Sequence, residues 1–152
     1  MADQSLRLER RFDASPERVW CALLDPEITR QTFIDAGMKD CEVVRDVRVG
    51  GTWRIAARQG EMEMTTQGEY LKVDRARRVS FTFAMPQFSP NQDWITAVLT
   101  PDGAGCHMSY VQNGPDIAAE LAQAPPGEKG GSQFGWEHML DAMAKALADG
   151  RA

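Results

Sequence analysis

The chain has few of the residues that most catalytic and metal sites need. It contains two histidines and three cysteines, and the cysteines, Cys21, Cys41 and Cys106, are widely spaced and odd in number. This spacing favours reduced thiols over a disulfide framework or a zinc site. The sequence also lacks a glycine-rich phosphate loop and the HExxH, GxSxG and CxxC motifs. We therefore expect no metal and no cofactor.

Long apolar runs and an excess of positive charge are missing as well. No run approaches the roughly 18 apolar residues that span a bilayer, and the N-terminal segment MADQSLRLERRFD has no signal-peptide core. We expect a cytoplasmic protein without a membrane segment. The chain carries 17 Lys and Arg against 22 Asp and Glu, a net charge of -5. A surface that follows nucleic-acid phosphates is therefore not expected.

What is present indicates one globular domain over residues 1–152. The chain has 152 residues, of which 43% are hydrophobic and 26% charged, enough to bury a core. Its strongest pattern lies at residues 130–148, where five large apolar side chains recur with the period of one helix face. They are Trp136, Met139, Leu140, Met143 and Leu147.

Local signals give this last helix its expected ends and surface pairs. Ser132 is a plausible N-cap after two glycines, and Gly150 suits the stop. Asp141 and Lys145 are spaced for an ion pair on one helix face. A helix with such an apolar face must pack on a partner surface, which we expect to be a sheet.

The N-terminal part predicts a strand followed by two short helices. Residues 6–13 alternate between apolar and charged, as a half-buried strand does. Ser15-Pro16 and Asp25-Pro26 each combine a capping residue with a proline at the first helical position. The second helix should end before the turn at Gly37.

Between Cys41 and Gln112 the period changes to two, which predicts six strands joined by short turns. Residues 41–49 and 52–58 form a hairpin around Gly50-Gly51, and a shift in the apolar set of residues 62–73 suggests a bulge near Gly68. The remaining strands are 79–85, 94–100 and 106–112. Residues 113–131 form a long connection, with a helical turn at 116–123, that we expect to act as a lid. The order β-α-α-β6-α predicts an α+β fold.

Several segments together resemble one known superfamily. They are FDASPERVW at 12–20, VGGTWR at 49–54, GEYLKV at 68–73, VSFTF at 79–83, and Gly135-Trp136 followed by Leu140 and Leu147. In this order they resemble the START-like, or SRPBCC, helix-grip superfamily, and within it the activator of Hsp90 ATPase homologue (AHSA1-like) family. The family often has a Trp-rich segment where this chain has QTFIDAG at 31–37.

The resemblance implies a curved antiparallel sheet of about seven strands gripping the long C-terminal helix. It also implies an apolar cavity between helix and sheet, which the superfamily uses for hydrophobic ligands and, in some branches, for catalysis. The inward periodicity and the resemblance together indicate a set of candidate ligand-binding residues. They are Trp53, Met64, Thr66, Tyr70, Phe81, Phe83, Trp94, Thr96, Tyr110, Trp136, Met139 and Met143.

The groups that could carry acid-base or nucleophilic chemistry give weaker signals. His138 should face solvent from the last helix, and Cys106 and His107 should point to opposite faces of one strand. Glu61 and Glu63 lie on a polar strand face. Glu69 has two interpretations: a surface carboxylate, or an acid that a bulge at Gly68 could turn inward, where it could titrate unusually. We therefore assign no catalytic residue.

Three functions remain open from the sequence. The first is binding of a small apolar or aromatic ligand in the cavity. The second is an aromatase-like or polyketide cyclase-like enzyme, in which Tyr70, Glu69 or Tyr110 moves protons. The third, implied by the family name alone, is an interaction module linked to the chaperone Hsp90. A homodimer is a general expectation for a chain of this kind.

Overall fold

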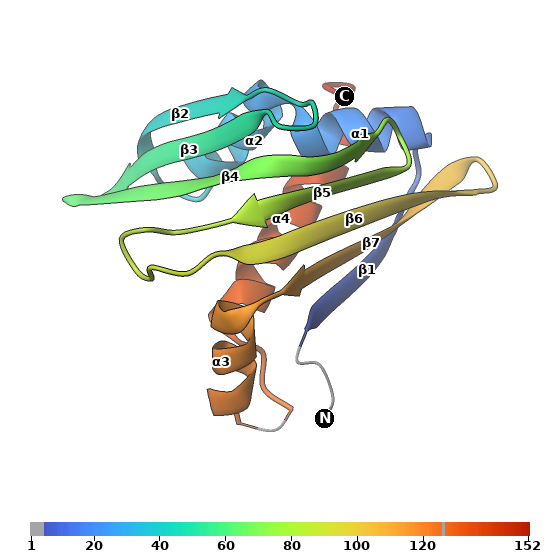
Figure 1. Cartoon of the computed structure of the whole chain (residues 1–152). Coiled ribbons are helices and arrows are strands. Elements are labelled where there is room, and N and C mark those ends of the chain that lie inside the picture. Colours follow the sequence, from blue (N-terminus) through green and yellow to red (C-terminus); the bar gives the residue numbers. More distant parts are fainter. Residues whose placement is uncertain (1–4, 126) are drawn as a thin grey trace.

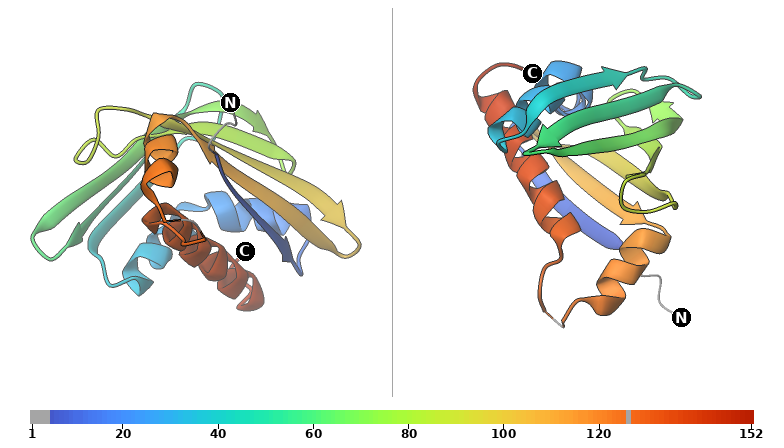
Figure 2. Two further views of the ribbon diagram at one scale, coloured as in Figure 1. Left: turned by 90° about the horizontal axis from the view of Figure 1, so that it is seen from below. Right: turned by 90° about the vertical axis from the view of Figure 1, so that its left-hand side faces the viewer.

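Seven strands of the chain form one antiparallel sheet that bends around the last helix (Figures 1 and 2). The computed structural model describes residues 5–125 and 127–152. In chain order the elements are β1 (Leu6–Phe12), α1 (Pro16–Leu24), α2 (Pro26–Asp35), β2 (Lys39–Arg45), β3 (Thr52–Gln59), β4 (Met62–Asp74), β5 (Arg78–Phe83), β6 (Asp93–Asp102), β7 (Gly105–Asn113), α3 (Pro115–Gln123) and α4 (Gly131–Ala148).

The strand order is β1-β7-β6-β5-β4-β3-β2, a meander to which β1 adds beside β7. The helices α1, α2 and α4 lie on the concave side of the sheet, and α3 lies beyond the N-terminal end of α4 (Figure 2). This arrangement confirms the predicted α+β helix-grip fold. No helix among the described residues is long and apolar enough to cross a bilayer.

The core lies between the concave face and the helices. The buried side chains of α4 include Leu140, Met143 and Leu147, which confirms the predicted apolar face. Arg18 of α1 donates hydrogen bonds to the carbonyl oxygens of Leu147 and Ala152, over 2.8 and 2.7 Å. Because a positive charge suits the C-terminal end of a helix, Arg18 fixes that end of α4 over the sheet.

The N-terminal end of α4 differs from the prediction. The N-cap is Gly130, without a side-chain hydrogen bond, so the predicted cap at Ser132 is wrong. Ser132 lies inside the first turn, where its hydroxyl donates to Glu120 of α3 over 2.9 Å. Asp141 pairs with Arg10 of β1 over 2.7 Å rather than with Lys145. Tertiary contacts therefore replace the two local ones that the sequence suggested.

The strand before the first hairpin ends earlier than predicted. β2 stops at Arg45, and Val49 is 64% exposed in the loop that follows. The loop returns on itself because Gly50 adopts a φ of +84° and a Cβ on Gly51 would overlap the carbonyl oxygen of Asp46. Two glycines thus set the path of the loop into β3.

The bulge in β4 lies three residues beyond its predicted place. The pairing of β4 with β5 shifts between Tyr70 and Lys72, so that Leu71 is the extra residue. Gly68 is in regular register opposite Trp53. A Cβ there would lie 2.6 Å from the Trp53 indole nitrogen and would overlap the carbonyl oxygen of Thr82. Gly68 is therefore required for close packing rather than for a bulge.

The predicted helical turn after β7 is the nine-residue helix α3. Its N-terminus is held by Asp93, a fully buried residue at the start of β6. The Asp93 carboxylate accepts hydrogen bonds from the backbone nitrogens of Asp116 and Ile117, over 3.0 and 2.9 Å. This carboxylate supplies the cap that Gly114, at the N-cap position, lacks.

Candidate functional site

A cavity of about 510 Å³ lies between α4 and the concave face of the sheet. Its walls come from α1 and α2 on one side, from β3, β4, β5 and β7 on another, and from α4 above. Most of these wall residues are apolar or aromatic. We call this space the grip cavity.

Nine of the twelve predicted binding residues line the grip cavity. They are Trp53, Met64, Thr66, Phe81, Phe83, Tyr110, Trp136, Met139 and Met143. The positions follow from the strand period, because alternate residues of β3, β4 and β5 point to the concave face. The cavity also explains why Trp136 and Met139 are less covered than Leu140 on the same helix.

The remaining three predicted residues lie elsewhere. The expectation that Trp94 and Thr96 line the cavity is wrong: Trp94 is 41% exposed, and Thr96 shares its face and contacts the hydroxyl of Ser80. Their neighbours Ile95 and Ala97 point inward instead. Tyr70 points inward but lies in the core behind the cavity wall rather than in it.

The cavity wall is a continuous series of aromatic rings. Trp53 contacts Phe83 with 6.3 Å between ring centroids, and Phe83 contacts Trp136 at 5.2 Å. Tyr110 also contacts Trp136, with 5.0 Å between the ring centroids. These separations and tilts are those that aromatic pairs prefer. The rings form a rigid surface against which a flat apolar molecule could pack.

A buried polar chain orients Trp136 in this wall. Its indole nitrogen donates to the side-chain oxygen of Gln112 over 2.8 Å, and the Gln112 amide nitrogen donates to Asp93 over 2.9 Å. Gln112 and Asp93 are both buried, so each depends on the others for its hydrogen bonds. This series of hydrogen bonds links Asp93, which caps α3, to the indole ring of Trp136 on α4.

A comparison with models of known protein families identifies the family of the chain. The model of the family described as activator of Hsp90 ATPase homolog 1-like protein matches residues 13–148. The chain belongs to this family. This confirms the resemblance that the sequence segments indicated. The comparison with functionally curated proteins found no match.

Solved structures of several bacterial proteins share the fold of this chain. Protein CV1439 from Chromobacterium violaceum has 28% sequence identity and a TM-score of 0.77, with 93% of this chain and 95% of that chain covered. A protein from Rhodobacter sphaeroides has 20% identity and a TM-score of 0.79, with 97% and 94% covered. Protein Ms6760 from Mycobacterium smegmatis has 18% identity and a TM-score of 0.76, with 95% and 91% covered.

Sequence reasoning missed a charged residue of the wall. Arg45, at the end of β2, lines the grip cavity, and its guanidinium lies 5.6 Å from the Trp53 ring centroid. It donates to the hydroxyls of Tyr70 and Thr29, each over 3.1 Å. Its place in the strand could have identified it. Arg45 lies an even number of residues from the inward-facing Cys41 and Val43 and therefore shares their face of β2.

The wall formed by α1 and α2 was also missed. These two helices contribute Ala22, Leu23, Leu24, Thr29, Thr32 and Phe33. Their apolar stripes were visible in the sequence, but the side of the cavity that they cover depends on how two short helices pack against α4.

Most candidates for acid-base chemistry lie away from the grip cavity. Glu61, Glu63 and Glu69 are exposed, so Glu69 is a surface carboxylate and the alternative of an inward turn at a bulge does not hold. His138 is exposed as predicted, yet it reaches the cavity rim and its Nε2 lies 3.4 Å from the Thr32 carbonyl oxygen. Tyr110 is buried, and desolvation raises the pKa of its hydroxyl far above the ordinary value. It therefore remains a neutral phenol at physiological pH.

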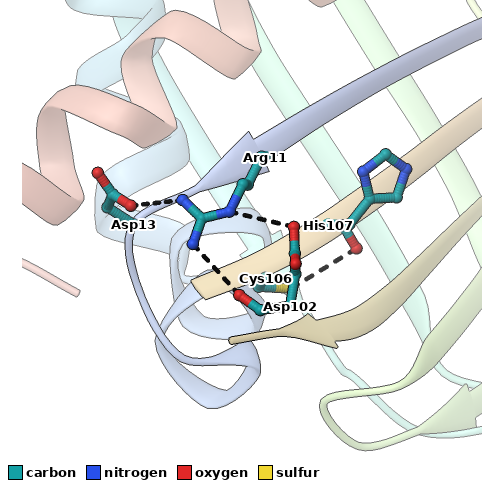
Figure 3. Close-up of polar contacts among 5 residues, drawn as sticks. All are labelled: Arg11, Asp13, Asp102, Cys106 and His107. Atoms are coloured by element: carbon teal, nitrogen blue, oxygen red, sulfur yellow. Dashed lines mark hydrogen bonds and ion pairs between the residues drawn. The ribbon is translucent and has the colours of Figure 1, made fainter. Parts of the chain in front are cut away.

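Cys106 and His107 do not form a thiolate pair, as the strand period predicted. Figure 3 shows the His107 ring directed away from the Cys106 sulfur, which donates a hydrogen bond to the backbone oxygen of His107 over 3.7 Å. His107 instead lies 3.1 Å from Glu9 of β1. Burial raises the pKa of the Cys106 thiol, which makes it a poor nucleophile. Close to Cys106, the Arg11 guanidinium donates hydrogen bonds to the carboxylates of both Asp13 and Asp102 (Figure 3).

Metal binding has no support in residues 5–125 and 127–152. Within these ranges no three His, Cys, Asp or Glu side chains gather in a way that could hold an ion. The grip cavity offers apolar contact together with a few polar side chains, among them Arg45 and Glu120.

Proposed function

We propose that the chain binds a hydrophobic or aromatic small molecule in the grip cavity. The observation that carries this proposal is the cavity itself, about 510 Å³ in volume and lined mainly by apolar and aromatic side chains. Small-molecule sites commonly have volumes of about 300 to 1,000 Å³ with this kind of lining. The apolar side chains of the grip cavity would leave water when an apolar molecule binds, which favours binding.

The wall residues support an aromatic or otherwise flat ligand. The rings of Phe83, Trp136 and Tyr110 are fixed by their mutual contacts. Met64, Met139 and Met143 lie among the other lining residues. Because methionine is flexible and polarisable, it adapts to ligands of different shape while the rings keep their places.

Binding agrees better with the wall than the two other functions that the sequence left open. Of the three residues named for proton transfer in a cyclase or aromatase, Tyr110 is held neutral, Tyr70 lies behind the cavity wall and Glu69 faces solvent. A module that interacts with Hsp90 rests on the family's description. The grip cavity gives ligand binding a physical basis of its own.

Fluorescence titration with N-phenyl-1-naphthylamine tests the proposal. This neutral probe should bind the wild-type protein with about 1:1 stoichiometry. Native mass spectrometry of freshly purified protein should also show any small molecule that copurifies. A wild-type protein that binds neither the probe nor any molecule of a lipid and aromatic panel would contradict the proposal.

A variant that fills the cavity locates the binding site. Gly135 of α4 lines the cavity, and a Cβ there would meet no atom within 4 Å. Gly135→Phe should therefore weaken probe binding at least about tenfold by occupying the space. The matched control is Ala148→Phe, which adds the same ring to an exposed position of the same helix. Equal probe affinity in both variants would place the binding site elsewhere.

A further inference from the structure

The wall of the grip cavity contains a cation whose hydrogen-bond partners are neutral. Arg45 is half-buried, and both of its terminal nitrogens donate to hydroxyl groups, those of Tyr70 and Thr29. Its third donor, Nε, is shielded from solvent and has no acceptor in the described part of the chain. The guanidinium is thus fixed in place, with its Nε–H unused.

Among the residues that the structure describes, no carboxylate forms an ion pair with this charge. The ion pairs found among residues 5–125 and 127–152 do not include Arg45. Glu120 also lines the cavity, but its carboxylate accepts hydrogen bonds from the hydroxyl and backbone nitrogen of Ser132 at the start of α4. A partly buried charge without a counter-ion is costly, and buried charges are normally paired.

A second unused donor lies beside Arg45. The indole nitrogen of Trp53 is buried without an acceptor among the described residues, and Trp53 pairs with Arg45 across β2 and β3. Neither an indole N–H nor a guanidinium can accept a hydrogen bond. What this part of the wall presents to a ligand is the positive charge of Arg45, because the Trp53 indole nitrogen packs against Gly68 of β4.

We infer that the ligand of the grip cavity is an aromatic or aliphatic carboxylate whose charged end faces Arg45. This inference rests on the proposed binding function and specifies the class of ligand. The ring series that runs from Trp53 through Phe83 to Trp136 begins beside the guanidinium and continues along the apolar wall. An elongated molecule with one anionic end matches this layout. Arginine suits a planar carboxylate because its donors form a fixed fork.

A matched pair of competitors tests the inference. 2-Naphthoate and 2-naphthamide have the same ring and nearly the same shape, and at pH 7 the acid is ionised because carboxyl pKa values lie near about 4. Each should be titrated against bound N-phenyl-1-naphthylamine. The wild-type protein should bind the carboxylate about tenfold or more tightly than the amide, as expected for a hydrogen-bonded charge pair.

Variants assign the preference to Arg45. Arg45→Met should reduce the ratio of the two affinities to within about threefold of unity. Arg54→Met is the matched control, because Arg54 is exposed on neighbouring β3 and lies outside the cavity wall, so the ratio should persist. If Arg45→Met does not fold, Arg45→Gln removes the same charge and keeps a side-chain donor for Tyr70.

The outcomes separate this inference from the binding function. Equal wild-type affinity for the two competitors would overturn the carboxylate inference and leave the cavity as an apolar site. A preference that survives in Arg45→Met and Arg45→Gln would also overturn it. Failure of the neutral probe to bind the wild-type protein would contradict the binding function, and the carboxylate inference with it.

Discussion

The indole nitrogen of Trp136 on α4 donates a hydrogen bond to the side-chain oxygen of Gln112 on β7 over 2.8 Å. The same glutamine donates to the buried carboxylate of Asp93, which caps α3. One short chain of polar contacts therefore holds the helix, the sheet and the connection between them. It also orients the ring that forms a central part of the grip cavity.

Replacement of Trp136 by phenylalanine should separate the hydrogen bond from the packing. Trp136→Phe keeps an aromatic ring but leaves the buried oxygen of Gln112 without this donor. We expect a loss of about 1 to 3 kcal/mol in the free energy of unfolding. Trp136→Ala also removes the ring contacts and should cost about 3 to 5 kcal/mol. Urea denaturation measures both.

The control for these variants lies two residues earlier on the same helix. Phe134 is 61% exposed, so Phe134→Ala should change stability by no more than about 0.5 kcal/mol. If Trp136→Ala were to cost less than about 1 kcal/mol, the conclusion that α4 is anchored to the sheet through this residue would be wrong.

Two glycine-to-alanine substitutions should change stability in opposite directions. At Gly68 a Cβ would overlap the Thr82 carbonyl oxygen, and Gly68→Ala should cost about 1 to 3 kcal/mol or more. At Gly135, in the interior of α4, the added Cβ meets no atom, so Gly135→Ala should stabilise the protein by about 0.5 to 1 kcal/mol. Thermal melts of both variants check this. Equal effects would contradict the close packing assigned to Gly68.

The strand period predicted much of the cavity wall, and it failed where both faces of a strand are apolar. In β3 and β5 one face alone carries the large apolar residues, so Trp53, Phe81 and Phe83 were placed correctly. In β6 both faces of the strand contain apolar residues, and the prediction named the aromatic Trp94 rather than Ile95. The strand register determines which face of β6 points inward, because Ile95 pairs with inward-facing Phe81. That long-range pairing is not visible in β6 itself.

Other parts of the site depend on packing between distant segments. Arg45 had the correct parity for an inward residue, yet a charge in a strand is usually solvated. Its inward position becomes reasonable once Tyr70 and Thr29, from β4 and α2, are placed beside it. The start of α4 was misplaced for the same reason, because its partner Glu120 lies on another helix.

The three thiols should differ in reactivity according to their burial. Cys106 and Cys41 are buried, and desolvation raises the pKa of each thiol, whereas Cys21 is partly exposed. Native protein treated with 5,5′-dithiobis(2-nitrobenzoate) should therefore show one fast reaction, and unfolded protein three. Cys21→Ser should abolish the fast phase. A fast phase that persists in this variant would contradict the burial of the other two thiols.

The ion pair at the start of α4 should make stability depend on pH in the acid range. Lys129 donates to both oxygens of Glu137, over 2.9 and 3.1 Å, and this contact lowers the pKa of the Glu137 carboxyl. Because the folded pKa lies below the unfolded one, the stabilisation is complete above the unfolded pKa, about 4.3, and is lost as the pH falls through the folded pKa.

Denaturation at several pH values tests the direction in which stability changes with pH. Glu137→Gln should be less stable than the wild-type protein at pH 7, and the difference should shrink below about pH 4 as the wild-type carboxyl takes up its proton. Lys129→Met should show the same trend, because it removes the other partner of the pair. Lys145→Met, at the opposite end of the helix, should give a difference that does not change over this range. A Glu137→Gln difference that stays constant down to pH 3 would show that the carboxyl titrates alike in the folded and unfolded chain, and that Lys129 does not stabilise its charge.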